Sequence, residues 1–226
     1  MLSAAQLTGR FAAARLDQWP VRLLDLSHAR LLGWGIVCGL GYGAVMGSFG
    51  GFGGERLWQV FFSAAKVPLL LLVTFTICLP SFFVLNTLLG VRADFAQSVR
   101  ALVATQAALS VILLSLSPYT ALWYVSSTDY SAAILFNGLM FGVASLSGQW
   151  LLRRYYQPLM ARNARHRLLL RVWLALYVFV GIQMAWVLRP FVGQPALPVQ
   201  FFREDAWGNA YVTTAQLIWR LVAPGR

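Results

Sequence analysis

Charged residues are scarce in this chain of 226 residues, and acidic residues are the scarcest. Only 11% of the residues are charged, and seven Asp and Glu stand against eighteen Lys and Arg. Soluble domains contain about 25% charged and about 45–50% apolar residues, whereas 59% of this chain is apolar. The apolar residues form long runs instead of the spaced patterns of soluble helices and strands. The composition excludes an ordinary soluble protein and indicates an integral membrane protein.

Residues that commonly carry catalysis or bind metals are also few. The two cysteines, Cys38 and Cys78, lie within apolar runs, and the chain has no CxxC or HExxH motif. We expect both cysteines to be small packing residues. The two histidines, His28 and His166, lie in basic segments, where we expect solvated surface side chains. The sequence therefore predicts a protein that is not an enzyme and that has no cofactor or metal site.

The net charge of +11 does not by itself indicate a nucleic-acid-binding protein. Almost all basic residues are arginines that flank apolar runs, and the aromatic residues lie within those runs or beyond their opposite ends. The glycine-rich stretch 50–54 lacks the GK[ST] ending of a phosphate-binding loop. We expect membrane lipid as a partner, no nucleic acid, and a flexible connection at residues 50–54.

Five apolar runs are long enough to cross a membrane. The clearest is Leu168 to Val187, twenty residues with Arg171 as the single charge. At about 1.5 Å per residue, such a run covers a hydrocarbon core of roughly 30 Å. The sequence therefore predicts an all-α polytopic membrane protein with five transmembrane helices, at residues 31–49, 67–90, 101–125, 130–152 and 168–188.

Amphipathic segments flank these spans. Residues 1–30 carry arginines and an apolar face, which fits a helix on the membrane surface or, alternatively, a partner-binding tail. We expect a short interfacial helix from Leu57 and a surface helix at residues 207–222, and either of them entering the bilayer would change the number of spans. The predicted organisation is a cytoplasmic segment at 1–30, a transmembrane domain at 31–190, and an extracytoplasmic loop and helix at 191–226.

The distribution of basic residues predicts the orientation. Cytoplasmic loops are enriched in Lys and Arg. With the N-terminus inside, twelve basic residues are cytoplasmic: Arg10, Arg15, Arg22, Arg30, Arg92, Arg100, Arg153, Arg154, Arg162, Arg165, Arg167 and Arg171. The opposite side has six: Arg56, Lys66, Arg189, Arg203, Arg220 and Arg226. We therefore expect a bacterial inner-membrane protein with a cytoplasmic N-terminus and a periplasmic C-terminus.

Small residues at four-residue spacing mark candidate helix contacts. Four glycines of the first span fall on one side of a helix: Gly35, Gly39, Gly43 and Gly47. This spacing lets another helix approach closely, and we favour a helix of the same chain over a second copy. The pair Gly138 and Gly142 in the fourth span is also expected to permit close packing.

Within the span boundaries predicted above, the interiors contain amides, hydroxyls and prolines but no Asp, Glu or Lys. Ion-coupled carriers usually need an ionisable group near mid-membrane, so this absence argues against coupled transport. We expect Gln106, Asn137 and Gln183 to form hydrogen bonds between helices, and Pro80 and Pro118 to kink their helices.

The segment after the fifth span is the candidate for a distinctive site. Its candidate structural or partner-binding residues are the following: Arg189, Pro190, Arg203, Glu204, Asp205, Trp207 and Asn209. We predict that Arg189 pairs with Glu204 or Asp205, which would fold residues 195–202 back over the helix ends as a cap. Lipid contact through a snorkelling Arg189 is the alternative.

Two stretches carry a resemblance to known proteins. Residues 57–81 (LWQ through KVP to CLPS) and 183–211 (QMAWVLRPFVG, FFR and WGNAY) resemble a group of uncharacterised bacterial inner-membrane proteins. Five spans with this orientation also resemble the Yip family of membrane-trafficking proteins, although the aspartate-leucine-tyrosine-glycine-proline motif of eukaryotic members is absent. The first resemblance implies a bacterial inner membrane and no particular activity.

These features predict a function without catalysis. We expect a membrane-embedded scaffold or subunit that binds another membrane protein or complex. The alternative is a channel or permease component, in which Pro80, Pro118 and the interior amides would line a path between the second, third and fourth spans.

Overall fold

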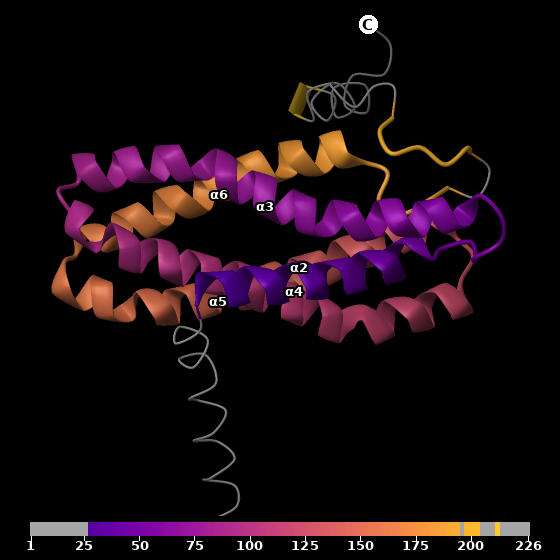
Figure 1. Cartoon of the computed structure of the whole chain (residues 1–226), viewed down its shortest axis with the longest axis horizontal. Helices are drawn as coiled ribbons and strands as arrows, with labels where there is room; N and C mark the ends of the chain where they lie inside the picture. Colours follow the sequence, from indigo (N-terminus) through magenta and orange to yellow (C-terminus); the bar gives the residue numbers. More distant parts are fainter. Residues whose placement is uncertain (1–26, 195–196, 204–210, 213–226) are drawn as a thin grey trace, which may run out of the picture.

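The computed structural model describes residues 27–194, 197–203 and 211–212, and over these residues it consists of helices joined by loops, with no strand. Five long helices and one short 3-10 helix follow one another (Figure 1): α2 (His28–Gly47), α3 (Arg56–Leu88), η1 (Arg92–Asp94), α4 (Phe95–Ser126), α5 (Tyr130–Arg162) and α6 (Arg165–Leu188). The five α-helices are each long and apolar enough to cross a membrane. The predicted fold class is confirmed.

The helices form an elongated bundle with two distinct ends (Figure 1). Helix α2 packs on both α3 and α4, while α5 packs mainly on α4 and α6 mainly on α3. The α3–α4 and α5–α6 connections lie at what we call the arginine-rich end. Residues 48–55, 127–129, 189–194 and 197–203 lie at the opposite end, which we call the loop end.

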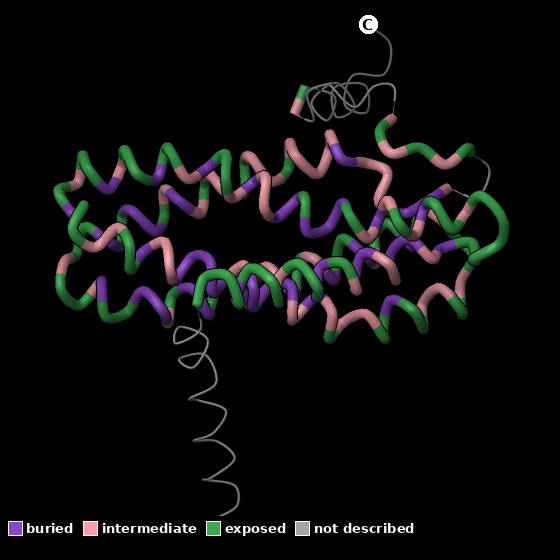
Figure 2. Tube along the Cα trace, viewed as in Figure 1, coloured by how far each residue is buried: buried purple, intermediate pink, exposed green. Residues whose placement is uncertain are grey.

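The core has two clusters of buried apolar side chains. One is centred on Trp173, which packs edge-on against Phe82 with ring centroids 4.9 Å apart. The other is centred on Tyr42 and includes Val192 from the segment after α6. Buried positions follow the inward sides of the helices (Figure 2). The outward sides are rich in exposed leucine, valine, phenylalanine and tryptophan, as expected for helices surrounded by lipid. Cys38 and Cys78 are both buried, as predicted.

The glycine stripe of α2 is where the backbones of α2 and α3 come closest. A Cβ at Gly43 would collide with the Ser63 carbonyl and would lie 2.7 Å from the Ala64 Cα. A Cβ at Gly47 would lie 2.8 Å from the Val60 Cα. Real Cβ atoms do not approach other atoms so closely, so only glycine fits at these positions. The predicted contact within one chain is confirmed, since Gly39 also faces α3 and Gly35 faces Ala107 of α4.

The corresponding prediction for α5 is wrong within the chain. A Cβ added at Gly138 or at Gly142 would meet nothing within 4 Å. Both glycines lie on the exposed side of α5, together with Leu135 and Leu139. The spacing is the same as in α2, but it falls on the side of the helix that faces away from the bundle.

Two predicted boundaries are also wrong. The short interfacial helix expected from Leu57 is the beginning of α3, which continues without interruption for 33 residues. The basic connection expected at residues 153–167 is mostly helix, because α5 continues to Arg162 and α6 begins at Arg165. Apolar composition marks the part of a helix that fits the hydrocarbon core, and helices can extend beyond that core.

The two prolines predicted to kink the spans lie inside continuous helices. Pro80 is within α3 and Pro118 within α4, and both side chains are exposed on the outward side. Proline has no backbone N–H to donate, so in both helices the missing backbone hydrogen bond lies on the outward side of the bundle. The kinks stay predictions.

Candidate functional site

A lysine side chain is completely buried at the loop end. Lys66, the eleventh residue of α3, has 0% exposed surface. Its Nζ donates a 2.7 Å hydrogen bond to the Pro190 carbonyl and lies 4.9 Å from the centre of the Phe201 ring. A buried ammonium is costly unless it is hydrogen-bonded, and an aromatic face adds further stabilisation. Lys66 thus fixes the segment after α6 to the side of α3.

Two polar residues on the same face of α3 bind the next carbonyl. Ser63 and Gln59 precede Lys66 by about one and two helical turns, so the three side chains project in the same direction. The Ser63 hydroxyl and the Gln59 Nε2 both donate to the Phe191 carbonyl, the latter at 3.3 Å. The Gln59 amide also donates to the Ser63 hydroxyl at 3.0 Å. We call Gln59, Ser63 and Lys66 the α3 clamp.

The segment that the clamp binds begins where α6 ends at Leu188. The Arg189–Pro190 peptide bond is cis, and Val192 and Gly193 are buried. A Cβ at Gly193 would lie 2.6 Å from the Gln59 Cγ, so a side chain here would displace the clamp. The Val192 carbonyl accepts a 3.4 Å hydrogen bond from the Tyr130 hydroxyl of α5. Three successive carbonyls thus accept hydrogen bonds from two different helices.

Residues 197–203 also lie against α3. We call residues 189–194 and 197–203 together the covering segment. The Phe201 ring packs edge-on against Phe62 of α3 with centroids 5.3 Å apart, in addition to lying over Lys66. A cavity of about 230 Å³ lies between α3 and this segment. Its lining comes from the first turn of α3 and from the covering segment: Arg56, Gln59, Pro190, Gly193, Gln194, Leu197, Pro198, Val199, Gln200 and Arg203. The cavity has arginine and amide side chains at its wall, which are donors suited to an anionic group.

The residues that we predicted as structural or partner-binding candidates in this region do not gather at one site in the structure. Arg189 lies over the Trp186 ring, with the guanidinium carbon 3.5 Å from the ring centre. Pro190 contributes its carbonyl to Lys66, and Arg203 lines the cavity. The other predicted residues are outside the described part of the chain: Glu204, Asp205, Trp207 and Asn209. The ion pair of Arg189 with Glu204 or Asp205 therefore stays a prediction, although residues 197–203 do fold back over α3.

The α3 clamp is absent from the sequence predictions. Lys66 was expected in a short surface helix, so the statement that the spans lack lysine is wrong for the continuous helix α3. The spacing of Gln59, Ser63 and Lys66 is a signal that the sequence does contain. It places three hydrogen-bonding side chains on one face of a helix that is mostly apolar.

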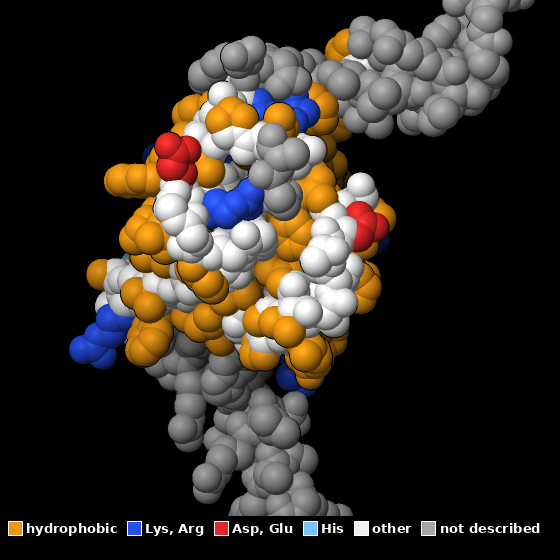
Figure 3. All heavy atoms as spheres, turned by 90° about the vertical axis from the view of Figure 1, so that its right-hand side faces the viewer, with side chains coloured by type: hydrophobic (Ala, Val, Ile, Leu, Met, Phe, Trp, Pro, Cys, Tyr) orange, Lys and Arg blue, Asp and Glu red, His pale blue; other side chains and the backbone are white. Residues whose placement is uncertain are grey.

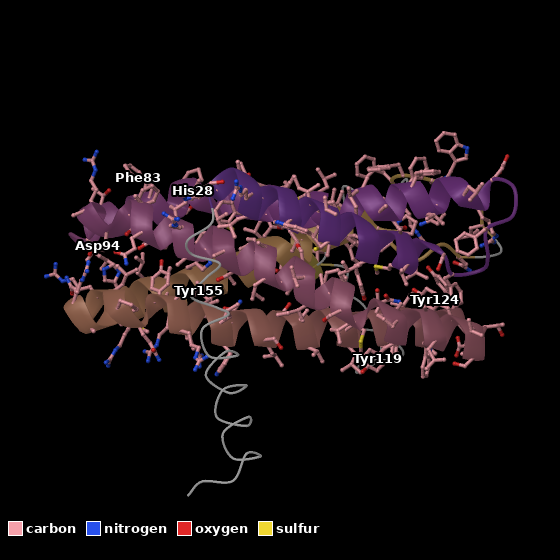
Figure 4. All side chains as sticks on the ribbon, turned by 60° about the horizontal axis from the view of Figure 1, so that its bottom comes forward. His28, Phe83, Asp94, Tyr119, Tyr124 and Tyr155 are labelled. Atoms are coloured by element: carbon pink, nitrogen blue, oxygen red, sulfur yellow. The ribbon has the colours of Figure 1, made fainter. Side chains whose placement is uncertain are left out.

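Interior amides join the helices as predicted. The Asn137 side chain of α5 accepts from the Tyr42 hydroxyl of α2 at 3.1 Å and donates to the Tyr124 hydroxyl of α4 at 2.6 Å. The Gln106 Oε1 of α4 accepts from the Tyr177 hydroxyl of α6 at 2.9 Å. Both expectations are confirmed, whereas the role of Gln183 stays a prediction. Figure 4 shows Tyr124 toward the loop end and Asp94 at the opposite end.

The arginine-rich end is held by a histidine and an arginine from the start of α6. His166 is completely buried, so the prediction of a solvated side chain is wrong. Its Nε2 lies 3.1 Å from the Asp94 carboxylate, and Arg165 donates a 2.9 Å hydrogen bond to the Leu89 carbonyl. The first turn of α6 thereby binds the connection between α3 and α4. His28, in contrast, is exposed as predicted. Within the described ranges no three His, Cys, Asp or Glu residues gather as metal ligands would.

The fold and these contacts define a class, the multi-pass membrane protein, with five long helices in the part of the chain that the structure describes. Comparison of the chain with protein-family models, with curated proteins and with solved structures gives no match. The resemblances to uncharacterised inner-membrane proteins and to the Yip family therefore stay predictions.

Proposed function

We propose that this chain is a non-catalytic scaffold or subunit of a membrane complex in a bacterial inner membrane. The N-terminus is on the cytoplasmic side, and the loop end with the α3 clamp faces the periplasm. Seven of the nine described basic residues from Arg30 to Arg171 on the arginine-rich side are exposed: Arg30, Arg92, Arg153, Arg162, Arg165, Arg167 and Arg171. Exposed arginines of this kind are typical of cytoplasmic membrane surfaces.

One observation carries the proposal. Three interior polar side chains in the described part of the chain, Asn137, Gln106 and Lys66, form hydrogen bonds to other helices or to the covering segment. Polar groups used in this way fix the relative positions of helices. A bundle whose polar side chains hold its own helices together is suited to act as a stable subunit. The lipid-facing sides of its helices are then available for contacts with a partner.

The same observation favours this function over the alternative of a channel or permease component. A path between α3, α4 and α5 would use Pro80, Pro118 and the interior amides. Pro80 and Pro118 point outward, and Asn137 and Gln106 are occupied by tyrosine hydroxyls. A described cavity between α2, α3 and α4 measures about 30 Å³ and is lined mainly by leucine, alanine and other apolar residues.

Site-specific photo-cross-linking in native membranes tests the proposal. A photoreactive residue is placed at Val37 of α2 or at Leu139 of α5, two lipid-facing positions that are each 59% exposed. Matched probes at buried Leu113 and Ala144 serve as controls for reaction within the chain. A subunit gives a protein adduct of defined mass from at least one exposed position and none from the buried controls.

Lipid adducts alone at both exposed positions, together with solute flux through liposomes that contain only the purified chain, would contradict the scaffold function. That combination would support the channel or permease instead.

A further inference from the structure

The cavity at the loop end combines two cationic side chains from distant parts of the sequence. Arg56 is the first residue of α3, and Arg203 is the last residue of the covering segment. The contacts of Phe201 with Phe62 and Lys66 hold the preceding part of that segment against α3. Two guanidinium groups at one cavity present planar sets of N–H donors, which match the oxygens of a phosphate group.

The wall between the arginines is polar and fixed. Gln59 is only 2% exposed, and its amide is held by Ser63 and by the Phe191 carbonyl. Gln194 and Gln200 line the same cavity and add amide donors. Gln59 thus uses its N–H donors to fix the wall, and the donors for an anion come from the two arginines, Gln194 and Gln200.

Neither of the described acidic residues at this end lines the cavity. They are Glu55 and Asp129, and the Asp129 carboxylate is occupied by the Ser131 backbone N–H at 2.9 Å. The loop end viewed face-on has acidic side chains at two separated places with basic side chains between them (Figure 3). Among the described residues, the two charged side chains that line the cavity are therefore both basic.

The size and surroundings of the cavity indicate the source of that anion. Its volume of about 230 Å³ is below the range of about 300–1,000 Å³ for pockets that enclose whole drug-sized ligands. Leu57, Trp58 and Phe61, within two turns of Arg56, are 46%, 61% and 63% exposed. Exposed tryptophan and phenylalanine beside an arginine are typical of the membrane interface, where headgroups and acyl chains meet.

We propose that Arg56, Arg203 and the amides of Gln194 and Gln200 bind the phosphate of an anionic phospholipid headgroup, with the acyl chains lying along the exposed side of α3. The phosphate lies between the two guanidinium groups, and the apolar part of the lipid contacts Trp58 and Phe61. This site is independent of whichever protein partner the bundle has.

The test measures lipid binding to the purified full chain in detergent by native mass spectrometry. Phosphatidylglycerol is compared with zwitterionic phosphatidylcholine, and inorganic phosphate is added as a competitor in a separate arm. We expect a preferred single phosphatidylglycerol, and a loss of affinity of about tenfold or more in the double variant Arg56→Gln with Arg203→Gln. The matched control, Arg92→Gln with Arg162→Gln, changes two exposed arginines at the opposite end and should bind as the unmodified chain does.

A second variant keeps both arginines. Gln200→Glu places a carboxylate at the exposed rim of the cavity and should also weaken phosphatidylglycerol binding, even if the double arginine variant fails to fold. Equal binding of both lipids, or phosphatidylglycerol affinity unchanged by Gln200→Glu and by the double variant, would overturn the site. Displacement of the lipid by an equal concentration of inorganic phosphate would keep the phosphate chemistry but overturn the lipid as its source.

Discussion

The two ends of the bundle use their basic residues in opposite ways. At the arginine-rich end most described arginines are exposed, whereas at the loop end none of the four described cations is exposed: Arg56, Lys66, Arg189 and Arg203. Lys66 is completely buried, and Arg189 lies over Trp186. Exposed cations contribute little to folding and much to orientation in the membrane. We therefore expect each cation at the loop end to contribute more to the stability of the fold than an arginine at the opposite end.

The difference shows that a count of basic residues predicts the side of the membrane but not the role of each residue. Lys66 adds one charge to the count for its side, as does any surface arginine. Its burial follows from its place on α3, where Gln59, Ser63 and Lys66 face the covering segment. The comparison predicts that substitutions at the two ends have unequal effects.

The largest effect is expected at Lys66. Lys66→Ala leaves the buried Pro190 carbonyl without its donor and creates a cavity beneath Phe201. We expect the free energy of unfolding to fall by about 2–4 kcal/mol. The measurement is denaturant-induced unfolding in detergent micelles. Arg162→Ala, at an exposed position of the opposite end, should change the same quantity by less than about 0.5 kcal/mol. Equal effects of the two substitutions would remove the distinction between the ends.

The next effect is expected at the glycine contact. Gly43→Val forces α2 away from the backbone of α3 at Ser63 and Ala64. Overpacking of this kind costs about 1–3 kcal/mol. Gly142→Val is the matched control, because its side chain meets nothing within 4 Å. Thermal unfolding of both variants in the same detergent compares them, and a greater loss for Gly142→Val would show that the α5 glycines, and not those of α2, form the close contact.

A smaller effect is expected at the arginine-rich end. Asp94→Asn weakens the contact with buried His166 but leaves an oxygen that can still accept a hydrogen bond. We expect a loss of about 1 kcal/mol, less than at Lys66, because the Asp94 side chain is 27% exposed and water can replace part of the contact. Unfolding under the same conditions provides the comparison. A loss larger than that of Lys66→Ala would reverse the order of the two ends.

Hydropathy and glycine spacing were sufficient to predict the five helices and the α2–α3 contact. Length and apolar composition decide whether a helix can span a membrane, and both are properties of the sequence. The orientation of each helix about its axis is set by neighbouring helices. For this reason Gly138 and Gly142, at the same spacing as the α2 glycines, were assigned a contact that the bundle does not make.

The candidate site could not be predicted from local sequence, because its residues come from two segments that are distant in the chain. Lys66 and Pro190 are 124 residues apart, and their contact depends on α3 and α6 lying side by side. His166 and Asp94 are likewise brought together only by the packing of two turns. A polar residue near the end of a span has the same local sequence whether it faces lipid, water or another segment. We predicted that residues 195–202 fold back over the helix ends, but the buried lysine beneath Phe201 was not predicted.

We propose above all that residues 189–194 and 197–203 close over α3 on the periplasmic side of the membrane. The most direct test of this proposal is cross-linking of Phe62→Cys with Phe201→Cys in intact cells, in a chain with Cys38 and Cys78 replaced by alanine. The two native rings are 5.3 Å apart, so a short, membrane-impermeant bifunctional thiol reagent should join the introduced cysteines within one chain. An intramolecular cross-link formed from outside the cells, and absent from each single-cysteine variant, is the predicted result. Failure to cross-link while Phe201→Cys alone is labelled from outside would show that the segment does not cover α3, and cross-linking only after the membrane is permeabilised would place the loop end in the cytoplasm.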